Sequence, residues 1–250
     1  MRMPSAMLCT ALAATLSVGC RRATAPAAAA MVFASASLTA PFRELVREFE
    51  RRRPGRAVDL HFAGTPQLVM QVREGAPADV FAAADDASMR RVVDTGWVAS
   101  APVPFAGNRL TIVVAKGNPR HIGGLADLAR QGLRVVLCGP EVPAGRYARQ
   151  ALSRAGVTVE SVSDEPSVKA VVTKVALGEV DAGIVYATDV TDAVGEVVAV
   201  PIPEASNVRA TYEIALLSGG HARADGAAFL AFVTSADGRA ILGRFGFAGP

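Results

Sequence analysis

Small hydroxyl residues stand between a predicted strand and a predicted helix at two places in this chain. Ser37 lies in MVFASASLTA (31–40), and Thr65 lies in HFAGTPQL (61–68). A strand that passes through a small polar turn into a helix presents hydroxyls and bare backbone N–H groups to a ligand. The same arrangement recurs further along the chain, in LCGPEVPAGRYA (137–148), in SDEPSV (163–168) and, as a strand end, in AGIVYATD (182–189).

These turns contain almost no positive charge, because Arg146 is the only Lys or Arg at a turn position. A fully ionised oxyanion has acceptor oxygens and no donors, so neutral hydroxyl and N–H donors suit it. The positive ends of several helices can balance its charge without salt bridges. The pattern therefore favours a small anion over a phosphorylated nucleotide or a metal ion.

The sequence gives less support to a metal site or to an enzyme active site than to an anion site. Asp79, Asp85 and Asp86 form an acidic group, but no His or Cys joins them and they border the apolar run VFAAA, so we expect structural roles and no metal cation. The chain has no G-x-S-x-G, H-E-x-x-H or phosphate-loop motif, and no His lies near Ser37 or Thr65 in the sequence. We therefore expect a binding protein without a cofactor, and not an enzyme.

Apolar runs alternate with helix-period segments from residue 31 onward, which predicts βαβ units and mostly parallel sheets flanked by helices. The spacing of Phe42, Leu45, Val46 and Phe49 predicts a helix with one buried face. The C-terminal region 225–245 predicts two short helices. The predicted strands are 32–36, 58–63, 79–84, 110–115, 134–138, 182–186, 197–200 and 212–217.

Two loosely patterned segments, 102–108 and 201–209, flank the block between them, and both lead into strand-like runs. This arrangement predicts a two-lobed α/β fold in which the chain leaves the first lobe and returns to it, with the paired crossovers acting as a hinge. We expect lobe 1 to comprise 31–107 and 206–250, and lobe 2 to comprise 108–205. A ligand of such a protein binds in the cleft between the lobes.

The N-terminus is typical of an export signal. Arg2 precedes an apolar stretch, 7–18, that is too short to span a bilayer, and LSVGC ends at Cys20. We expect residues 1–19 to be a signal peptide, Cys20 to be lipidated, and residues 20–30 to form a flexible tether. The protein would then lie on the outer face of the cell membrane, or in the periplasm if the signal is simply cleaved. Leu16 lies one position further from Cys20 than a lipoprotein cleavage box usually places it, which keeps the second alternative open.

The charge balance argues against a nucleic-acid partner. The formal net charge is +3, and it falls to +2 without the first 19 residues, which contain one charge, Arg2. Nucleic-acid binding requires a basic stripe with interleaved aromatics. The single basic run, 51–53 with Arg56, lies at a predicted helix end, where cations interact favourably with the negative end of the helix dipole. We expect a monomer with no nucleic-acid partner.

Several phrases of the chain together resemble one family. GAPADVFAAAD (75–85) and PAG-x-YA (143–148) are specific for it, and VFASASLT, SVKAVV, AGIVYATD and GRFGF follow its order and spacing. From about Met31 to the C-terminus, the chain resembles the periplasmic molybdate-binding proteins. These are the substrate-capturing subunits of molybdate ABC importers and have the type II periplasmic-binding fold, which the resemblance implies here.

The resemblance also implies a set of ligand-binding residues. Position by position, the hydroxyl donors fall on Ser37 and on Thr65, where the family more often has Ser. The backbone N–H donors fall on Ala144 and Val168, and the closing phenol falls on Tyr186. The implied function is capture of molybdate, and of tungstate, for delivery to ABC permease subunits, with the membrane reached through the lipid anchor.

Alternatives remain open at this point. Ser37 and Thr65 can be ordinary helix caps, and Tyr186 can be a strand aromatic with its hydroxyl at the surface. The runner-up function is binding of another tetrahedral oxyanion such as sulfate, and an exported enzyme is the rival from another class. The effector lobe of a transcription factor shares the fold, but the export signal argues against it.

Overall fold

The computed structural model describes residues 28–250 except 192 and 194. The predicted signal peptide, Cys20 and most of the predicted tether lie outside the described residues. The first strand begins at Ala30, inside the predicted tether. Within the described part of the chain, no helix is long and apolar enough to cross a membrane.

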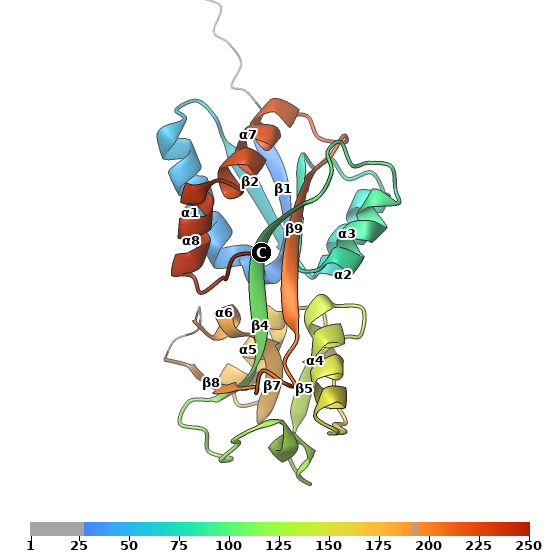
Figure 1. Ribbon diagram of the computed structural model, residues 1–250, viewed down its shortest axis with the longest axis vertical. Helices are drawn as coiled ribbons and strands as arrows, with labels where there is room; N and C mark the ends of the chain where they lie inside the picture. The colour runs from blue at the N-terminus through green and yellow to red at the C-terminus, as the bar shows by residue number, and fades with distance from the viewer. Residues whose placement is uncertain (1–27, 192, 194) are drawn as a thin grey trace, which may run out of the picture.

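Two lobes lie one above the other along the long axis of the molecule (Figure 1). In lobe 1, the upper half, strands β1 (Ala30–Ser35), β2 (Val58–Ala63) and β3 (Val80–Ala83) run parallel. In lobe 2, strands β5 (Val135–Cys138), β6 (Asp164–Glu165) and β7 (Ala182–Tyr186) also run parallel. The predicted two-lobed α/β fold is confirmed.

Two long antiparallel strands, β4 (Val103–Ala115) and β9 (Arg209–Leu216), run between the lobes. Residues 103–109 of β4 pair with β9, whereas residues 110–114 pair with β7 and 111–115 with β8 (Val197–Pro201). One strand therefore belongs to both sheets, and each lobe's sheet is mixed where these strands join it. The predicted boundary at 107/108 falls inside β4.

The predicted start of this strand at Leu110 was wrong, because β4 begins at Val103. Its first half lacks an apolar alternation and contains Pro104, which removes a ladder donor. Pro104 lies at a register shift between β4 and β9, a place where a strand tolerates proline. Pairing with β9, which lies about a hundred residues away in the sequence, makes this segment a strand.

Helices cover both faces of the sheet in lobe 1. One face carries α1 (Thr39–Arg52), α7 (Arg223–Val233) and α8 (Ala236–Arg244), and the other carries α2 (Thr65–Arg73) and α3 (Asp86–Val93) (Figure 1). The predicted buried face of α1 is confirmed, since Phe42 and Phe49 are fully buried and each packs edge-on against Phe229, with ring centroids 6.0 and 5.4 Å apart. The two predicted C-terminal helices are confirmed as α7 and α8.

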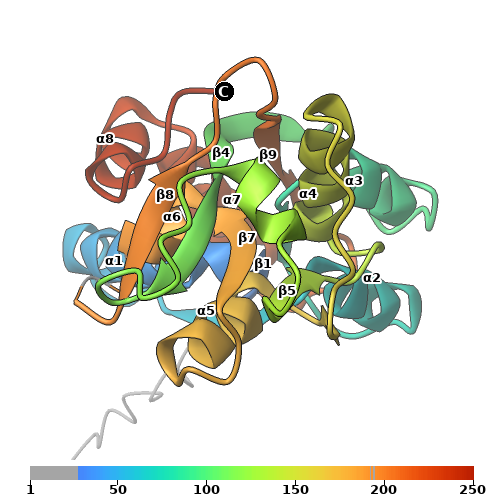
Figure 2. The same ribbon diagram turned by 90° about the horizontal axis from the view of Figure 1, so that it is seen from below.

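Lobe 2 has a smaller, aliphatic core. Figure 2 shows α4 (Pro143–Arg154) and α5 (Val168–Ala176) on two sides of β5 and β7. Gly145 allows α4 to approach the end of β5, because a Cβ there would overlap the backbone oxygens of Cys138 and Gly139. The remaining elements are the short helix α6 (Ala187–Thr191) and the 3-10 turns η1 (Ala36–Leu38) and η2 (Leu125–Ala129).

The parallel strands of both lobes end at the same gap. β1 leads into η1, β2 leads into α2, and β7 ends at Tyr186, while the segments after β5 and β6 lead into α4 and α5. Ligands of open α/β sheets bind outside the carboxyl ends of the strands. The fold therefore brings several strand ends and helix starts together between the lobes.

Candidate anion site

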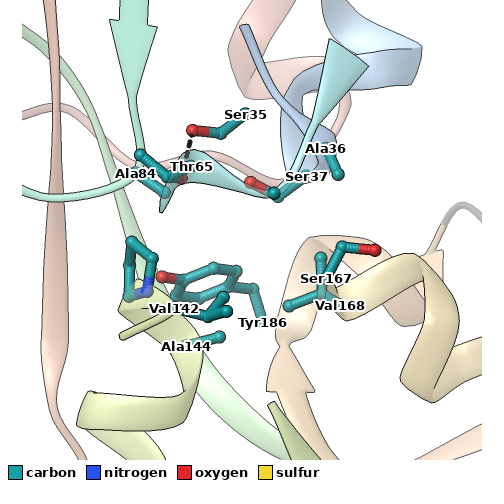
Figure 3. A pocket seen from close by; sticks show the side chains of 12 residues that line it. Ser35, Ala36, Ser37, Thr65, Ala84, Val142, Ala144, Ser167, Val168 and Tyr186 are labelled. Atoms are coloured by element: carbon teal, nitrogen blue, oxygen red, sulfur yellow. Dashed lines mark hydrogen bonds between the residues drawn. The ribbon is translucent and has the colours of Figure 1, made fainter. Parts of the chain in front are cut away.

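A small cavity of about 20 Å³ lies between the lobes. This is far below the roughly 300–1,000 Å³ typical of pockets for drug-sized ligands, so only a small ion suits it. All five residues singled out from the sequence line it, from both sides of the cleft (Figure 3). The lining residues are Ser35, Ala36, Ser37, Gly64, Thr65, Ala84, Val142, Pro143, Ala144, Ser167, Val168 and Tyr186.

The wall from lobe 1 carries hydroxyl side chains that are tied into hydrogen bonds. Ser37 lies in η1, and its Oγ is 3.0 Å from the hydroxyl of Tyr212 on β9. Thr65 is the first residue of α2, and its Oγ1 is 2.7 Å from Ser35 Oγ, as the dashed line in Figure 3 marks. Both residues are buried.

Neither hydroxyl caps a helix. The N-cap residue of α1 is Leu38 and that of α2 is Gly64, and neither cap has a side-chain hydrogen bond. The capping alternative for Ser37 and Thr65 is therefore wrong in this structure. Their hydroxyls contact other side chains and face the cavity instead.

Tyr212 links Ser37 to Asn108. Asn108 Oδ1 accepts from the Arg109 N–H at 2.9 Å, so the Asn108 amide group turns its N–H donors toward Thr188 Oγ1, at 2.9 Å, and the Tyr212 hydroxyl, at 3.5 Å. Either hydroxyl of the Ser37–Tyr212 pair can donate. If Tyr212, which accepts from Asn108, donates to Ser37 Oγ, the Ser37 proton can reach a ligand in the cavity.

The Thr65 hydroxyl has two possible hydrogen-bond arrangements. Ser35 Oγ also lies 3.2 Å from the carbonyl oxygen of Ala82. If Ser35 donates to that carbonyl, Thr65 donates to Ser35 and turns only lone pairs toward the cavity. If Ser35 donates to Thr65 instead, the Thr65 proton can reach a ligand. Thr65 therefore becomes a ligand donor only when the Ser35 hydroxyl rotates.

The wall from lobe 2 offers backbone donors at two helix starts. Ala144 is the second residue of α4, and Val168 is the first residue of α5. The first N–H groups of a helix have no acceptor within the helix and carry the positive end of its dipole. Ser167 caps α5 by accepting from the Ala170 N–H at 3.3 Å, which leaves the Val168 N–H at the cavity.

Tyr186 completes this wall. Its side chain is only 1% exposed, so the alternative of a surface hydroxyl is wrong. The ring packs against that of Tyr212, with centroids 5.7 Å apart, but the Tyr186 hydroxyl has no hydrogen-bond partner within the described part of the chain. Burial raises the pKa of Tyr186 well above its ordinary value, so the hydroxyl stays protonated and is a donor in need of an acceptor.

The lobes touch at the rim of the cavity. A Cβ on Gly64, in lobe 1, would overlap the carbonyl oxygen of Pro166, in lobe 2. An ion pair between Asp85 and Arg146 also joins the lobes, and a second one, between Arg91 and Glu141 at 2.7 Å, lies nearer the surface. The two lobes therefore meet in this structure, as in a closed form, and the cavity lies between the two walls.

The cavity carries no unbalanced charge from its neighbours. Arg146 at the start of α4 is paired with Asp85, and Lys169 at the start of α5 lies 3.6 Å from Asp189. Tyr186 is the one titratable residue among those lining the cavity, and no histidine is among them. This arrangement lacks a general base beside Ser37 or Thr65, and it can bind an acceptor-rich anion.

The acidic residues have structural partners. Asp79 accepts from the N–H groups of Met31 and Ala222, both at 2.9 Å, and Asp85 caps α3 by accepting from the Ser88 N–H at 2.9 Å. The structural roles expected for Asp79 and Asp85 are confirmed. Among the described residues, no group of three or more His, Cys, Asp or Glu side chains can hold a metal ion.

Sequence reasoning missed the residues behind the hydroxyls. Ser35 stands two positions before Ser37 in the same phrase and offered a signal, because it ends the strand on the same turn. Tyr212 and Asn108 gave none. They lie 175 and 71 positions beyond Ser37; Tyr212 reaches Ser37, and Asn108 reaches Tyr212, only because β4 and β9 run past the cleft.

Comparison with known proteins identifies the family of the chain. A family model described as bacterial extracellular solute-binding protein matches residues 30–248. The molybdate-binding protein ModA of Mycobacterium tuberculosis (strain ATCC 25618 / H37Rv) is 43% identical over 220 residues, which are 88% of this chain and 84% of that protein. ModA of Escherichia coli (strain K12) is 30% identical over 226 residues, which are 86% of this chain and 87% of that protein.

Solved structures share the fold. The periplasmic molybdate-binding protein of Azotobacter vinelandii matches with a TM-score of 0.76 at 20% identity, over 88% of this chain and 99% of that one. The sulfate-binding protein SubI from Mycobacterium tuberculosis H37Rv matches with a TM-score of 0.78 at 18% identity, over 88% of this chain and 86% of that one. At such identities the likeness establishes the fold and does not decide the ligand. The family model and the two ModA relatives decide the family: the chain belongs to the bacterial extracellular solute-binding proteins and is of the ModA type.

Proposed function

We propose that this protein captures molybdate, and tungstate equally, in the cavity between its lobes and delivers the anion to the permease of an ABC transporter. The observation that carries the proposal is the donor set. Two hydroxyls from lobe 1 face two helix-start N–H groups from lobe 2 and the phenol of Tyr186, which has no hydrogen-bond partner among the described residues. A tetrahedral dianion supplies acceptors to both walls at once. The ModA relatives at 43% and 30% identity support molybdate as that dianion.

Size is the property by which such a site selects. Neutral donors cannot separate one tetrahedral dianion from another by charge. Sulfate is smaller than molybdate and leaves donors unmet, at a cost of roughly 1–3 kcal/mol for each unsatisfied buried group. Molybdate and tungstate should bind alike, and sulfate should bind far more weakly.

Calorimetry of the purified protein with molybdate, tungstate, sulfate and phosphate tests the proposal. We expect matching affinities for the first two and at least a hundredfold weaker binding of sulfate. Sulfate binding as tightly as molybdate would replace the proposal with a general tetrahedral oxyanion or sulfate carrier. No binding of any of the four anions would reject an oxyanion site and reopen the possibility of an exported enzyme.

We also propose that the protein is a monomeric lipoprotein, exported and anchored through Cys20. The short apolar stretch ending in Gly-Cys and the Ala-rich tether behind it support the anchor. Residues 107/108 and 205/206 would mark the hinge between the lobes, since the first pair lies in β4, the second lies just before β9, and these two strands are the paired crossovers. Opening at this hinge would expose the cavity to the permease or to solvent.

The anchor has its own test. Cys20→Ala should move the protein from the membrane fraction to the soluble exported fraction, and mass spectrometry should find a diacyl modification on the wild-type N-terminus. A wild-type protein that carries no lipid, together with an unchanged distribution of Cys20→Ala, would contradict the anchor. That result would leave the anion-binding proposal intact.

A further inference from the structure

Arg146 lies near the start of α4, close to the cavity, and the proposed donor set does not use its charge. It follows Ala144 by two residues in α4, and its guanidinium forms an ion pair with the carboxylate of Asp85. Asp85 directly follows Ala84, which lines the cavity from lobe 1. Neither Asp85 nor Arg146 lines the cavity itself, so their effect on a bound anion would act through space.

The pair is firmly held from both lobes. Asp85 is 1% exposed, and its second oxygen accepts from the Ser88 N–H at 2.9 Å. Arg146 is about a quarter exposed, donates to the carbonyl oxygen of Glu141 at 2.6 Å, and lies 3.4 Å from Ser88 Oγ. Charges that are largely withdrawn from water act over a longer range than surface charges do.

The two charges have opposite effects on an anion in the cavity. Arg146 alone would attract it, and Asp85 alone would repel it. Together they nearly cancel, which leaves the helix dipoles and neutral donors to hold the anion. The Asp85 charge does reach the cavity, because it adds to the effect of burial in raising the pKa of Tyr186.

We propose that the Asp85–Arg146 pair sets the electrostatic potential of the anion site and thereby the strength with which the closed lobes hold a dianion. This inference rests on the proposed oxyanion function. Arg146 would raise the affinity for the anion without contacting it, and Asp85 would lower that affinity. Because molybdate and sulfate are both dianions, the pair should scale both affinities together and leave the preference between them unchanged.

The test measures molybdate and sulfate affinity by calorimetry in three variants at low ionic strength. Arg146→Gln should weaken molybdate binding by about tenfold or more, since it leaves the Asp85 carboxylate beside the site. Asp85→Asn should tighten it by about threefold or more, because Asn still serves as the N-cap of α3 through its one acceptor oxygen, while the charge that offsets Arg146 is lost. The double variant should return to within about threefold of the wild type, and the ratio of molybdate to sulfate affinity should stay constant throughout.

A neighbouring pair provides matched controls. Asp86 and Arg90 form an exposed ion pair within α3, at 2.6 Å, so Asp86→Asn and Arg90→Gln should each change affinity less than twofold. Equal weakening by Asp85→Asn and Arg146→Gln, with no recovery in the double variant, would overturn the proposal and make the pair a clamp between the lobes. Thermal unfolding without ligand identifies a variant that has merely lost its fold, and the remaining single variant then decides the sign.

The experiment distinguishes failure of the ion-pair proposal from failure of the proposed function. If the wild type binds sulfate and not molybdate, the molybdate assignment fails, and the same signs measured with sulfate still decide the pair. If molybdate binds the wild type and both single variants match it within twofold, the pair proposal fails and the function stands.

Discussion

The two walls of the cavity differ in how their donors are prepared. In lobe 1, Ser37 and Thr65 are already hydrogen-bonded, to Tyr212 and Ser35. In lobe 2, the Tyr186 hydroxyl has no partner within the described residues, and the Ala144 and Val168 donors are the free ends of helices. The lobe 1 wall is therefore organised by the protein, whereas the lobe 2 wall is completed by its ligand. An anion gains most from the second wall, and only when the lobes are closed.

The largest effect should come from Tyr186→Phe. The change keeps the ring and removes a donor to a charged ligand, so affinity for molybdate should fall by about 3 kcal/mol. Stability without ligand should hold or rise, because a buried hydroxyl without a partner is removed. Calorimetry and thermal unfolding check the two halves of this expectation. The half-buried Tyr147 of α4 does not line the cavity, and Tyr147→Phe provides the control.

The comparison between the walls would break if Tyr186→Phe lost stability and kept its affinity. Tyr186 would then be a packing residue. Small-angle scattering gives a further check, because the variant should show a smaller ligand-induced compaction than the wild type if the phenol bonds the anion only in the closed form.

A proline can remove one backbone donor from lobe 2. Val168 is the first residue of α5, a position that favours proline, and Ser167 before it is already extended, with φ −159° and ψ 160°. Val168→Pro should cost about 2 kcal/mol of molybdate affinity through loss of its N–H. Val168→Ala, which trims the side chain and keeps the N–H, is the matched control. Equal affinities in the two variants would show that the N–H of Val168 does not bind the anion.

The hydroxyls of lobe 1 should be unequal. Ser37→Ala should cost about 1.5–2 kcal/mol of affinity, and Thr65→Ala about 1 kcal/mol, because Tyr212 can donate to Ser37 while it accepts from Asn108, whereas Thr65 needs the Ser35 hydroxyl to turn away from the Ala82 carbonyl. Ser37→Ala should also destabilise the ligand-free protein, since Tyr212 loses its acceptor. Adding Tyr212→Phe should recover that stability without recovering the affinity. A larger loss in Thr65→Ala than in Ser37→Ala would reverse the assignment of protons.

These contacts also define what the sequence could predict. Elements with a clear period were found, such as the buried face of α1 and the parallel strands β2 and β7. The first half of β4 was missed, because Pro104 and the lack of an apolar alternation conceal a strand that exists only by pairing with β9. The two-residue strand β6 is too short to show a period. Local pattern fails where a distant partner decides the structure.

The residues of the candidate site also differ in whether the sequence could predict them. Side-chain donors were visible because hydroxyls in a strand-to-helix turn are chemically distinctive. Ala144 and Val168 act through backbone atoms that every residue has, so only a family resemblance singled them out. The supporting residues Tyr212 and Asn108, and the pairing of Arg146 with Asp85, depend on how the lobes close. No spacing within the chain encodes that approach.

The smallest effect should come from pH, and neither wall should respond to it near neutrality. Burial raises the pKa of Tyr186 and of Tyr212 well above the ordinary value, so both hydroxyls keep their protons. Molybdate affinity should therefore change less than twofold between pH 6.5 and 9, because this range lies below the ordinary tyrosine pKa of about 10.

The stability of the fold, unlike the affinity, should depend on pH. A raised pKa in the folded state stabilises the protein fully below the unfolded value, and this contribution is lost as the pH rises above it. Burial also raises the pKa of the Cys138 thiol, so unfolding should become easier above about pH 8.5, the ordinary thiol value, and easier still above about pH 10. Calorimetry and thermal unfolding across this range measure both trends. A steep loss of affinity between pH 7 and 9 would mean that a titrating group contacts the anion, which the donor set of the two walls excludes.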